Sequence, residues 1–496
     1  MTRILLTVAL AASLLSTHSA AAGRDVPAFR QKLSDYFDEL RNDPNAPPGF
    51  VVVIVQGDRT IFARAYGTRD VATNAPLTLN DAMYTGSTTK AYTGLLAAEL
   101  DRRGLVPLST SLKDLWPDLR LPNDIDPASV TAAKFLSHSA PISDAGLTFI
   151  SNETGQWTVD SVPAHLAKYA KPMTKPFEYS NFGPFMYSVM VQKKLGLPYS
   201  DAIRRYVAQP LGLRRTSARL EDFRPAEVGR CSTVSASASG WQSVPPKTTP
   251  RLNAAGGIYT SGNDAAAFLK AFTSGGRSEQ GRIPQSSLLK TVAPLSNQDA
   301  MTWGFHRRQY GLGWDISTYN DAPLWLRAGV YSGCRAMFVV FPDEKLGIGI
   351  LTLSDVAGNS FNASAVQQAY DYWTGAAGAD TQAAKRIAQF HQDAIESAAD
   401  LRKPPKRGIA VDPAVLRQYE GRYRSDRLGT MVVRLEGDKL RAHLGEFTLD
   451  LTPMATDRFE NQSGLELEVE AETFARAADG RITAFMWGDR RFDRVD

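Results

Sequence analysis

Several features that define large classes of protein are rare or missing in this sequence of 496 residues. No run reaches the roughly 18 consecutive apolar residues that a membrane-spanning helix needs, so we expect no stable membrane span. The 56 basic and 52 acidic residues give a net charge of only +4, and they form no long basic run interleaved with aromatic residues. This charge pattern is not that of a nucleic-acid-binding protein, and we expect no nucleic acid partner.

The usual motifs for metal-dependent and thiol-dependent chemistry are also missing. The sequence contains no H-E-x-x-H, no C-x-x-C and no G-x-S-x-G nucleophile elbow. The histidines beyond the N-terminal segment lack the spacing of metal ligands: His138, His165, His306, His391 and His443. We therefore expect neither a metal ion nor an organic cofactor. Cys231 and Cys334 could pair in an oxidising compartment, but their spacing does not decide this, and a chain this large does not need a disulfide.

The first residues have the pattern of a secretory signal. One early positive charge precedes an apolar run from Ile4 to Leu15, and a small-residue A-x-A site follows at Ala20 to Ala22. The apolar run is too short to cross a bilayer. We predict that residues 1–22 are a cleaved signal peptide and that the mature protein is exported to the periplasm.

The next 350 or so residues have the composition of a globular domain, in a chain with 43% hydrophobic and 22% charged residues. Two apolar strands joined at Gly57-Asp58 form a predicted hairpin, and two further apolar runs, 336–341 and 346–353, flank a turn late in the chain. Helical patterns separate these strands. We therefore predict an α+β domain over residues 23–375, whose sheet combines strands from distant parts of the chain.

Beyond residue 375 the sequence changes character. Residues 376–410 begin with an alanine-rich helical stretch and end in LRKPPKRG, whose prolines and charges indicate a linker. Residues 411–496 contain short strand patterns separated by turns, such as GTMVVRLEGDKLRAHLG. We predict a separate, small β-barrel-like domain there.

The stretch DAMYTGSTTKAYTG holds a candidate nucleophile, Ser87, three residues before Lys90. A serine hydroxyl attacks a carbonyl only when a neighbouring group removes its proton. Positions i and i+3 share one face of a helix, and a desolvated lysine can lose its charge and act as a base. The spacing alone is weak evidence, because it recurs at Ser287 and Lys290, where we interpret it as an ordinary helix start. At Ser87 the alternative interpretation is a helix-capping serine.

A triplet downstream distinguishes Ser87 from the second copy. Tyr179 and Asn181, in FEYSNFG, form the only Y-x-N in the chain. An ammonium stabilises a nearby phenolate, so Tyr179 could relay a proton between the nucleophile and the leaving group. The asparagine amide could hold both the lysine and a substrate carbonyl. Taken alone, Tyr179 would more often be a core aromatic residue with a satisfied hydroxyl.

The order of several sequence blocks resembles one known family: GSTTKAYTGLLAAELDRRGLVPLSTSL, VTAAKFLSHSAPIS, YSNFGPFMYSVMVQKKLGL, AAGGIYTSGNDAAAFL and YGLGW. They are similar to the serine β-lactamase and penicillin-binding-protein superfamily, specifically its branch of class C β-lactamases, D-aminopeptidases and family VIII esterases. The resemblance covers nearly the whole mature chain. It implies the β-lactamase/transpeptidase fold, an antiparallel sheet flanked by helices plus a helical region, and a lipocalin-like accessory domain at residues 411–496. It also implies a structural, hydrogen-bonding role for His138.

The family's third motif, a Lys-Thr-Gly or His-x-Gly triplet on an edge strand, has an altered counterpart here. The matching segment, LRAGVYSGCRAMFVVFP, gives Arg327-Ala328-Gly329. Arginine keeps a fixed positive charge but cannot shuttle a proton near neutral pH. A rival triplet, Lys345-Leu346-Gly347, fits the turn before the next strand better than an active site. The resemblance further implies an oxyanion hole formed by the backbone N–H groups of Ser87 and Val330.

These residues together predict a serine acyl hydrolase. Ser87 attacks a carbonyl, Lys90 and Tyr179 take and return the proton, and water resolves the resulting acyl-enzyme. Three further residues are predicted to bind the substrate: Asn181, Arg327 and Gly329.

The predicted substrate is a small molecule or peptide. Both the accessory domain and Arg327, which could bind a substrate carboxylate bidentately, favour a peptidase of the D-aminopeptidase or carboxypeptidase type. A family VIII-type carboxylesterase or a β-lactamase is the alternative, although the family's lactamases usually carry lysine in the third motif. An alternative of another class is a catalytically inactive protein that binds peptides or peptidoglycan fragments, which only the altered third motif favours. Substrate stereochemistry and oligomeric state stay open at this point.

Overall fold

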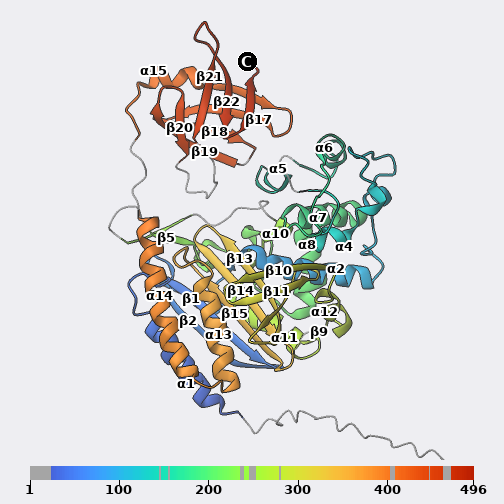
Figure 1. The fold of residues 1–496 in the computed structure, drawn as a ribbon, viewed down its shortest axis with the longest axis vertical. Coiled ribbons are helices and arrows are strands. Elements are labelled where there is room, and N and C mark those ends of the chain that lie inside the picture. The colour runs from blue at the N-terminus through green and yellow to red at the C-terminus, as the bar shows by residue number, and fades with distance from the viewer. Residues whose placement is uncertain are drawn as a thin grey trace, which may run out of the picture.

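The computed structural model describes residues 24–143, 147–154, 157–234, 240–244, 253–278, 281–402, 408–445, 447–461 and 471–496. The predicted signal peptide, residues 1–22, lies outside these ranges. The described residues form a large sheet covered by helices, a mostly helical region beside it, and a closed barrel at the C-terminal end (Figure 1). The predicted fold class, α+β with a further small β domain, is confirmed.

The large sheet of the described chain has nine antiparallel strands in the order β10-β11-β12-β13-β14-β15-β1-β2-β3. Its strands are β1 (Gly49–Gln56), β2 (Arg59–Asp70), β3 (Ala75–Pro76), β10 (Ser296–Thr302), β11 (Phe305–Tyr310), β12 (Asp315–Tyr319), β13 (Ala322–Tyr331), β14 (Cys334–Phe341) and β15 (Leu346–Thr352). Strand β1 pairs with β15, with Val52 opposite Ile350. The sheet therefore joins strands from distant parts of the chain, as the sequence predicts.

Helices cover both faces of this sheet. They are α1 (Val26–Leu40), α2 (Thr89–Arg102), α11 (Gly262–Thr273), α13 (Ser360–Thr374) and α14 (Ala379–Leu401). Side chains alternate between the two faces along a strand. In β1, Phe50 and every second residue after it pack in the core that α1, α13 and α14 form on one face of the sheet. Val51 and every second residue after it pack in the core that α2 and α11 form on the other face. Strands β14 and β15 are buried along their whole length, which explains their continuous apolar runs.

The helical region lies beside the sheet and contains the segments that follow the nucleophile. Its elements are the 3₁₀ turn η1 (Gly86–Thr88), α3 (Leu112–Leu115), α4 (Ala132–Leu136), α5 (Leu147–Glu153), α6 (Val162–Tyr169), α7 (Phe182–Leu195), α8 (Tyr199–Ile203), the π turn η3 (Arg204–Ala208), α9 (Gln209–Leu211), α10 (Asn253–Gly256) and α12 (Gln285–Thr291). The helix predicted after YSNFG is α7, and it ends at Gly196 in the left-handed conformation. The helix predicted from Ser87 begins two residues later, because Ser87 belongs to the tighter turn η1.

Among the described residues, three short strand pairs lie outside the large sheet and the barrel, and a disulfide lies next to one of them. The pairs are β4 (Met83–Tyr84) with β7 (Tyr259–Thr260), β5 (Ser232–Val234) with β6 (Trp241–Ser243), and β8 (Arg277–Ser278) with β9 (Gly281–Arg282). Cys231 and Cys334 form a disulfide, with Cα atoms 5.1 Å apart across a sequence separation of 103. The bridge ties the segment before β5 to the first residue of β14. It answers the question that the cysteine spacing leaves open.

The C-terminal strands close into a barrel. They are β16 (Gly421–Ser425), β17 (Gly429–Glu436), β18 (Lys439–Leu444), β19 (Phe447–Ala455), β20 (Arg458–Asn461), β21 (Glu472–Arg476), β22 (Ile482–Trp487) and β23 (Arg490–Arg494), after the short helix α15 (Pro413–Leu416). Strand β16 pairs with both β17 and β23, which closes the barrel. Large buried side chains such as Tyr423 and Phe485 give the barrel a packed core.

The barrel contacts the helical region through one aromatic residue of α5. The ring of Phe149 lies 5.0 Å from that of Phe447 and 4.7 Å from that of Trp487, both edge-on. An ion pair between Lys168 and Asp426 lies at the same interface, with 3.4 Å between Nζ and Oδ2, but both side chains are largely exposed. Exposed pairs stabilise little, so the aromatic contact is the main identified link.

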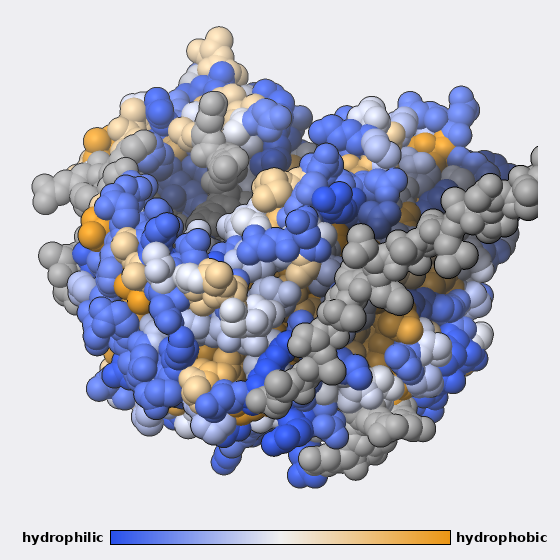
Figure 2. Space-filling view, turned by 60° about the horizontal axis from the view of Figure 1, so that its bottom comes forward, coloured by the Kyte–Doolittle hydropathy of each residue, from blue (hydrophilic) through white to orange (hydrophobic). Residues whose placement is uncertain are grey.

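On the face of the molecule drawn in Figure 2, the coloured surface is mostly hydrophilic and apolar residues form only small, separate patches. Within the part of the chain that the structure describes, no helix has both the length and the apolar character to cross a membrane.

Candidate active site

Ser87 lies in the turn η1, where the backbone touches strand β13. Two glycines permit this close approach. A Cβ atom on Gly86, whose φ is +51°, would lie 2.7 Å from the backbone nitrogen of Val330. A Cβ atom on Gly329 would lie 1.9 Å from the backbone oxygen of Thr85. Larger residues at these two positions would therefore separate the turn from the strand. The turn carries the N–H group of Ser87 and the strand that of Val330, and these two groups are predicted to form the oxyanion hole.

The ammonium of Lys90 is buried and has an acceptor for each of its three N–H bonds. The Nζ atom donates to Ser87 Oγ at 3.1 Å, Asn181 Oδ1 at 2.6 Å and the backbone oxygen of Ala255 at 2.8 Å. Burial lowers the pKa of Lys90 to about 8, although the charge of Tyr179 opposes this shift. The three acceptors suit the charged form of the lysine.

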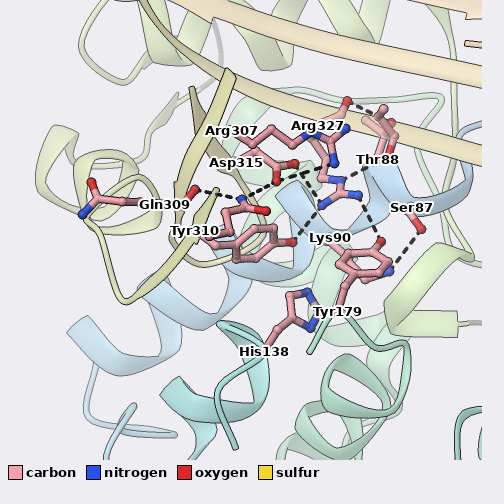
Figure 3. Close-up of polar contacts among 12 residues, drawn as sticks. Ser87, Thr88, Lys90, His138, Tyr179, Arg307, Gln309, Tyr310, Asp315 and Arg327 are labelled. Atoms are coloured by element: carbon pink, nitrogen blue, oxygen red, sulfur yellow. Dashed lines mark hydrogen bonds and ion pairs between the residues drawn. The ribbon is translucent and has the colours of Figure 1, made fainter. Parts of the chain in front are cut away.

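The hydroxyl of Tyr179 is close to two cations (Figure 3). Its oxygen accepts a hydrogen bond from Arg327 Nη2 at 3.0 Å, and Lys90 Nζ lies 4.9 Å from the centre of its ring. Burial alone would raise the pKa of Tyr179, but the nearby charges of Arg327 and Lys90 lower it to about 8. The residue remains 43% exposed, so part of the ring stays open to solvent.

The guanidinium of Arg327 is buried on β13, and protein groups occupy most of its donors. Nε donates to the backbone oxygen of Ala328 at 3.1 Å, Nη1 to Tyr310 Oη at 2.9 Å, and Nη2 to Tyr179. A carboxylate oxygen of Asp315 lies 3.4 Å from Nη1. Burial alone would lower the pKa of Arg327, but the surrounding tyrosines and Asp315 raise it above its usual value.

The predicted bidentate contact between Arg327 and a substrate carboxylate does not fit this geometry. A bidentate contact needs two adjacent N–H groups of the guanidinium. Nε and Nη1 are already engaged, and one N–H of Nη2 is taken by Tyr179. Of the five N–H groups of this arginine, three donate to protein oxygens, and the second N–H of Nη1 faces the carboxylate of Asp315 at 3.4 Å. The second N–H of Nη2 has no hydrogen bond among the described residues, so the guanidinium does not offer a substrate two free adjacent donors.

His138 packs against the rings of Tyr179 and Tyr310, with ring centres 4.6 and 4.7 Å away. Its Nδ1 accepts the backbone N–H of Ser180 at 3.2 Å, which places the proton of the neutral ring on Nε2. Burial, reinforced by the two nearby cations, keeps the pKa of His138 well below its usual value. The ring therefore stays neutral, in agreement with the hydrogen-bonding role expected of it.

Helix α5 holds the YSN segment, residues 179–181, through hydrogen bonds. Thr148 Oγ1 accepts the backbone N–H of Phe182 at 3.0 Å and lies 3.2 Å from Ser180 Oγ. Asn152 Nδ2 donates to the backbone oxygen of Asn181 at 3.4 Å. The YSN segment is thus fastened to α5 on both sides of Asn181.

Three contacts of this site were not expected from the sequence: the backbone oxygen of Ala255, the hydroxyl of Tyr310 and the carboxylate of Asp315. Tyr310 opens the YGLGW block and Asp315 follows it directly, so the sequence marks the segment that contains them. Their contact with Arg327 is not marked in the sequence, because it depends on how β11, β12 and β13 align.

The second Ser-x-x-Lys copy has a structural position. Ser287 donates to Glu99 at 2.6 Å and Lys290 to Asp101 at 2.5 Å, so both residues tie α12 to α2. The rival triplet beginning at Lys345 follows the β14–β15 turn, at the opposite end of β14 from the residues that pair with Val330. Across the residues that the structure describes, no group of three or more His, Cys, Asp or Glu side chains could hold a metal ion.

Two protein-family models match successive parts of the chain. The model described as Beta-lactamase matches residues 35–371. A second model, described as Domain of unknown function (DUF3471), matches residues 405–495. The first match contains every candidate catalytic residue, and the second contains the barrel.

Two curated proteins are similar to most of this chain. Unguisins hydrolase ungD of Aspergillus violaceofuscus is 24% identical over 454 residues, which cover 84% of this chain and 79% of that protein. Penicillin-binding protein 4 of Amycolatopsis lactamdurans is 24% identical over 345 residues, which cover 66% of this chain and 85% of that protein.

Solved structures share the fold. The octameric penicillin-binding protein homologue from Pyrococcus abyssi has a TM-score of 0.58 at 20% identity, over 95% of this chain and 100% of its own. The D-amino acid amidase from Ochrobactrum anthropi, complexed with L-phenylalanine, has a TM-score of 0.56 at 19% identity, over 69% and 99%. EstCE1, a hydrolase with promiscuous acyltransferase activity, has a TM-score of 0.53 at 18% identity, over 69% and 98%. At these identities the likeness shows the fold alone.

Proposed function

The chain belongs to the beta-lactamase family, and on this premise we propose that it is an exported serine peptidase of the D-aminopeptidase or carboxypeptidase type. The observation that carries the proposal is the hydrogen bond from buried Lys90 to Ser87 Oγ, next to a tyrosine held between two cations. This arrangement can activate a serine hydroxyl without a metal ion or a histidine base.

Tyr179 is the base in the proposed acylation step. All three N–H bonds of Lys90 are donated, so the ammonium holds Ser87 in place, and the phenolate of Tyr179 takes the hydroxyl proton. As the proton leaves, Oγ forms a bond to the substrate carbonyl carbon, and the carbonyl electron pair moves to the oxygen. The N–H groups of Ser87 and Val330 stabilise that oxyanion.

The tetrahedral intermediate then collapses and the acyl-enzyme is hydrolysed. The carbonyl re-forms, the bond to the leaving nitrogen breaks, and Tyr179 returns the proton to that nitrogen. In the second half, a water molecule gives a proton to Tyr179 as it attacks the ester carbon. The bond from carbon to Ser87 Oγ breaks, and Oγ takes the proton back.

Support for a peptide or amide substrate comes from the relatives. One is named a penicillin-binding protein, one an unguisins hydrolase, and one structural neighbour is a D-amino acid amidase. Because the structural neighbours also include EstCE1, a carboxylesterase is the second candidate function. Comparing D-alanyl and L-alanyl anilides with a short p-nitrophenyl ester separates the two. We expect the D-alanyl anilide to have the highest kcat/KM, and a marked preference for the ester would favour the esterase.

A fluorophosphonate probe tests the enzyme itself. We expect labelling of the purified protein and none of the Ser87→Ala variant, whereas Ser287→Ala, in the second Ser-x-x-Lys copy, should label normally. Turnover of the preferred anilide should be lost only in the first variant. If the protein takes no Ser87-dependent label and turns over no ester or amide, the inactive binding protein becomes the better description.

Export is part of the same proposal. The N-terminal pattern at residues 1–22 motivates it, and the Cys231–Cys334 disulfide supports it, because disulfides persist in oxidising compartments. Expression in a Gram-negative host followed by N-terminal mass mapping of the periplasmic fraction checks it. A full-length chain retained in the cytoplasm would contradict it.

A further inference from the structure

We propose that Asp315 and Tyr310 are positioning residues that hold Arg327 against Tyr179 and away from the substrate. As a result, the enzyme prefers substrates whose leaving group carries no carboxylate. This inference rests on the proposed hydrolase function and narrows it to aminopeptidase and amidase substrates, at the expense of carboxypeptidase substrates.

The first step of the argument is the place of Arg327 relative to the leaving group. Tyr179 returns its proton to the leaving nitrogen in the proposed mechanism, and Arg327 Nη2 donates to the same hydroxyl at 3.0 Å. A cation at this position is the natural partner for a leaving-group carboxylate if its donors are free. The direction of its remaining N–H groups therefore determines which leaving groups the site favours.

The second step is that the other side of the guanidinium is directed into the protein. Nη1 donates to Tyr310 Oη at 2.9 Å and faces Asp315 at 3.4 Å, and the Arg327 side chain is only 5% exposed (Figure 3). Tyr310 is itself fully buried. The cation is thus held between a tyrosine and an acid that no substrate can reach.

The third step is that Asp315 is itself fixed. Its side chain is 2% exposed, and Oδ1 accepts a hydrogen bond from Gln298 Nε2 at 2.8 Å. Arg307 Nη1 lies 3.9 Å from the same oxygen. The carboxylate therefore lies between two guanidinium groups and cannot follow Arg327 if that side chain turns toward a substrate.

The fourth step is that other described cations near this end of β13 are also engaged. Lys90 has three acceptors, and Arg335 pairs with Asp355 at 2.6 Å while donating to the backbone oxygen of Tyr331. A leaving-group carboxylate would lose water without gaining a full ion pair from these residues. Partial burial of an unpaired charge costs far more free energy than partial burial of a neutral carboxamide.

Two matched anilides test the substrate preference. D-alanyl-4-aminobenzoate and D-alanyl-4-aminobenzamide have leaving groups of nearly the same shape, one with a carboxylate and the other with a neutral carboxamide. We expect the wild-type protein to cleave the benzamide with a kcat/KM about tenfold higher than the benzoate. A wild-type preference for the benzoate would overturn the inference.

Two variants test the positioning role. Asp315→Asn keeps the shape of the side chain but removes the charge that holds Arg327, and Tyr310→Phe removes the hydroxyl that accepts from Nη1. Each should raise the benzoate-to-benzamide ratio of kcat/KM about fivefold or more, because the guanidinium can then turn toward the carboxylate. Asp299→Asn, an exposed acid on neighbouring β10, is the matched control and should leave the ratio unchanged.

The ratio separates positioning from general damage. A purely structural defect lowers kcat/KM for both substrates together and leaves the ratio at the wild-type value, which would contradict the inference. If Asp315→Asn does not fold, Tyr310→Phe and the wild-type comparison still decide it. If the proposed function is wrong, the result is different. Either the wild-type protein cleaves neither substrate, or the Ser87→Ala variant cleaves both substrates as the wild type does.

Discussion

At the scale of single residues, one tyrosine hydroxyl lies within reach of two cations with different roles. Lys90 donates to Ser87, Asn181 and a backbone oxygen, so its charge is used to hold the nucleophile. Arg327 donates to Tyr179 and cannot exchange a proton near neutral pH. The sequence predicts proton transfer by Lys90 and Tyr179 jointly. The geometry favours Tyr179 for the transfer and Lys90 for positioning.

This division predicts the pH dependence of the reaction. The rate needs Tyr179 deprotonated and Lys90 protonated, and both have their pKa lowered to about 8. As pH rises, kcat/KM should increase while Tyr179 ionises and decrease once Lys90 loses its charge, which gives a narrow maximum near pH 8. Of the other groups that contact Tyr179, Arg327 stays charged and the ring of His138 stays neutral, so neither adds a step to the profile.

Removing the guanidinium should shift the acidic side of this profile. Arg327→Gln takes away a positive charge that lowers the pKa of Tyr179, so the midpoint should move up by about one unit, toward the usual tyrosine value of about 10. Arg308→Gln, which changes an exposed arginine on β11, two strands away from β13, is the control and should not move the midpoint. An unchanged midpoint in Arg327→Gln would assign the acidic limb to a group other than Tyr179.

The order of the motifs was enough to choose Ser87 over Ser287 and to bring Tyr179 and Asn181 to the same site. These residues could be found because each lies in a short block with its own pattern. The environment of Arg327 could not be predicted in the same way. Its partners, Tyr310 and Asp315, come from two other strands, so their contact depends on the alignment of three strands and cannot be inferred from a single sequence block.

At the scale of secondary-structure elements, the disulfide fixes the hairpin that follows the third motif. Strand β13 carries Arg327 to Val330, the chain turns at Gly333, and Cys334 begins β14. The bridge attaches this turn to the segment before β5, and both cysteines are buried. Apolar runs were sufficient to predict β14 and β15, whereas the pairing of the two cysteines required the sheet to be assembled first.

Removal of the bridge should lower stability measurably. A disulfide that closes a loop of about 100 residues restricts the unfolded chain, and its loss typically costs about 2–4 kcal/mol. We expect the double variant Cys231→Ser/Cys334→Ser to lose about 3 kcal/mol in the free energy of unfolding, measured by urea denaturation without reductant. Reduced and alkylated wild-type protein should behave like the variant. Equal urea midpoints for variant and oxidised wild type would show that the bridge contributes nothing.

At the scale of the whole molecule, the barrel and the active site contact the same short helix. The sequence predicts a small β domain after a linker but not where that domain docks, because docking depends on surface shape. In the structure, Phe149 of α5 packs on Phe447 and Trp487 of the barrel. One residue earlier on the same helix, Thr148 holds the YSN segment through the backbone of Phe182.

The shared helix predicts that loosening the barrel contact weakens catalysis. Phe149→Ala removes two edge-on aromatic contacts, each worth about 1 kcal/mol, so α5 should hold Tyr179 and Asn181 less firmly. We expect kcat to fall about tenfold with little change in KM, because a small displacement of a proton-transfer group affects the chemical step more than binding. Phe149→Tyr, which keeps the ring, should retain most of the activity, and Leu289→Ala, an exposed apolar residue of α12, should retain all of it. If Phe149→Ala keeps the wild-type kcat while the barrel is shown by limited proteolysis to have detached, the barrel does not support the active site through α5.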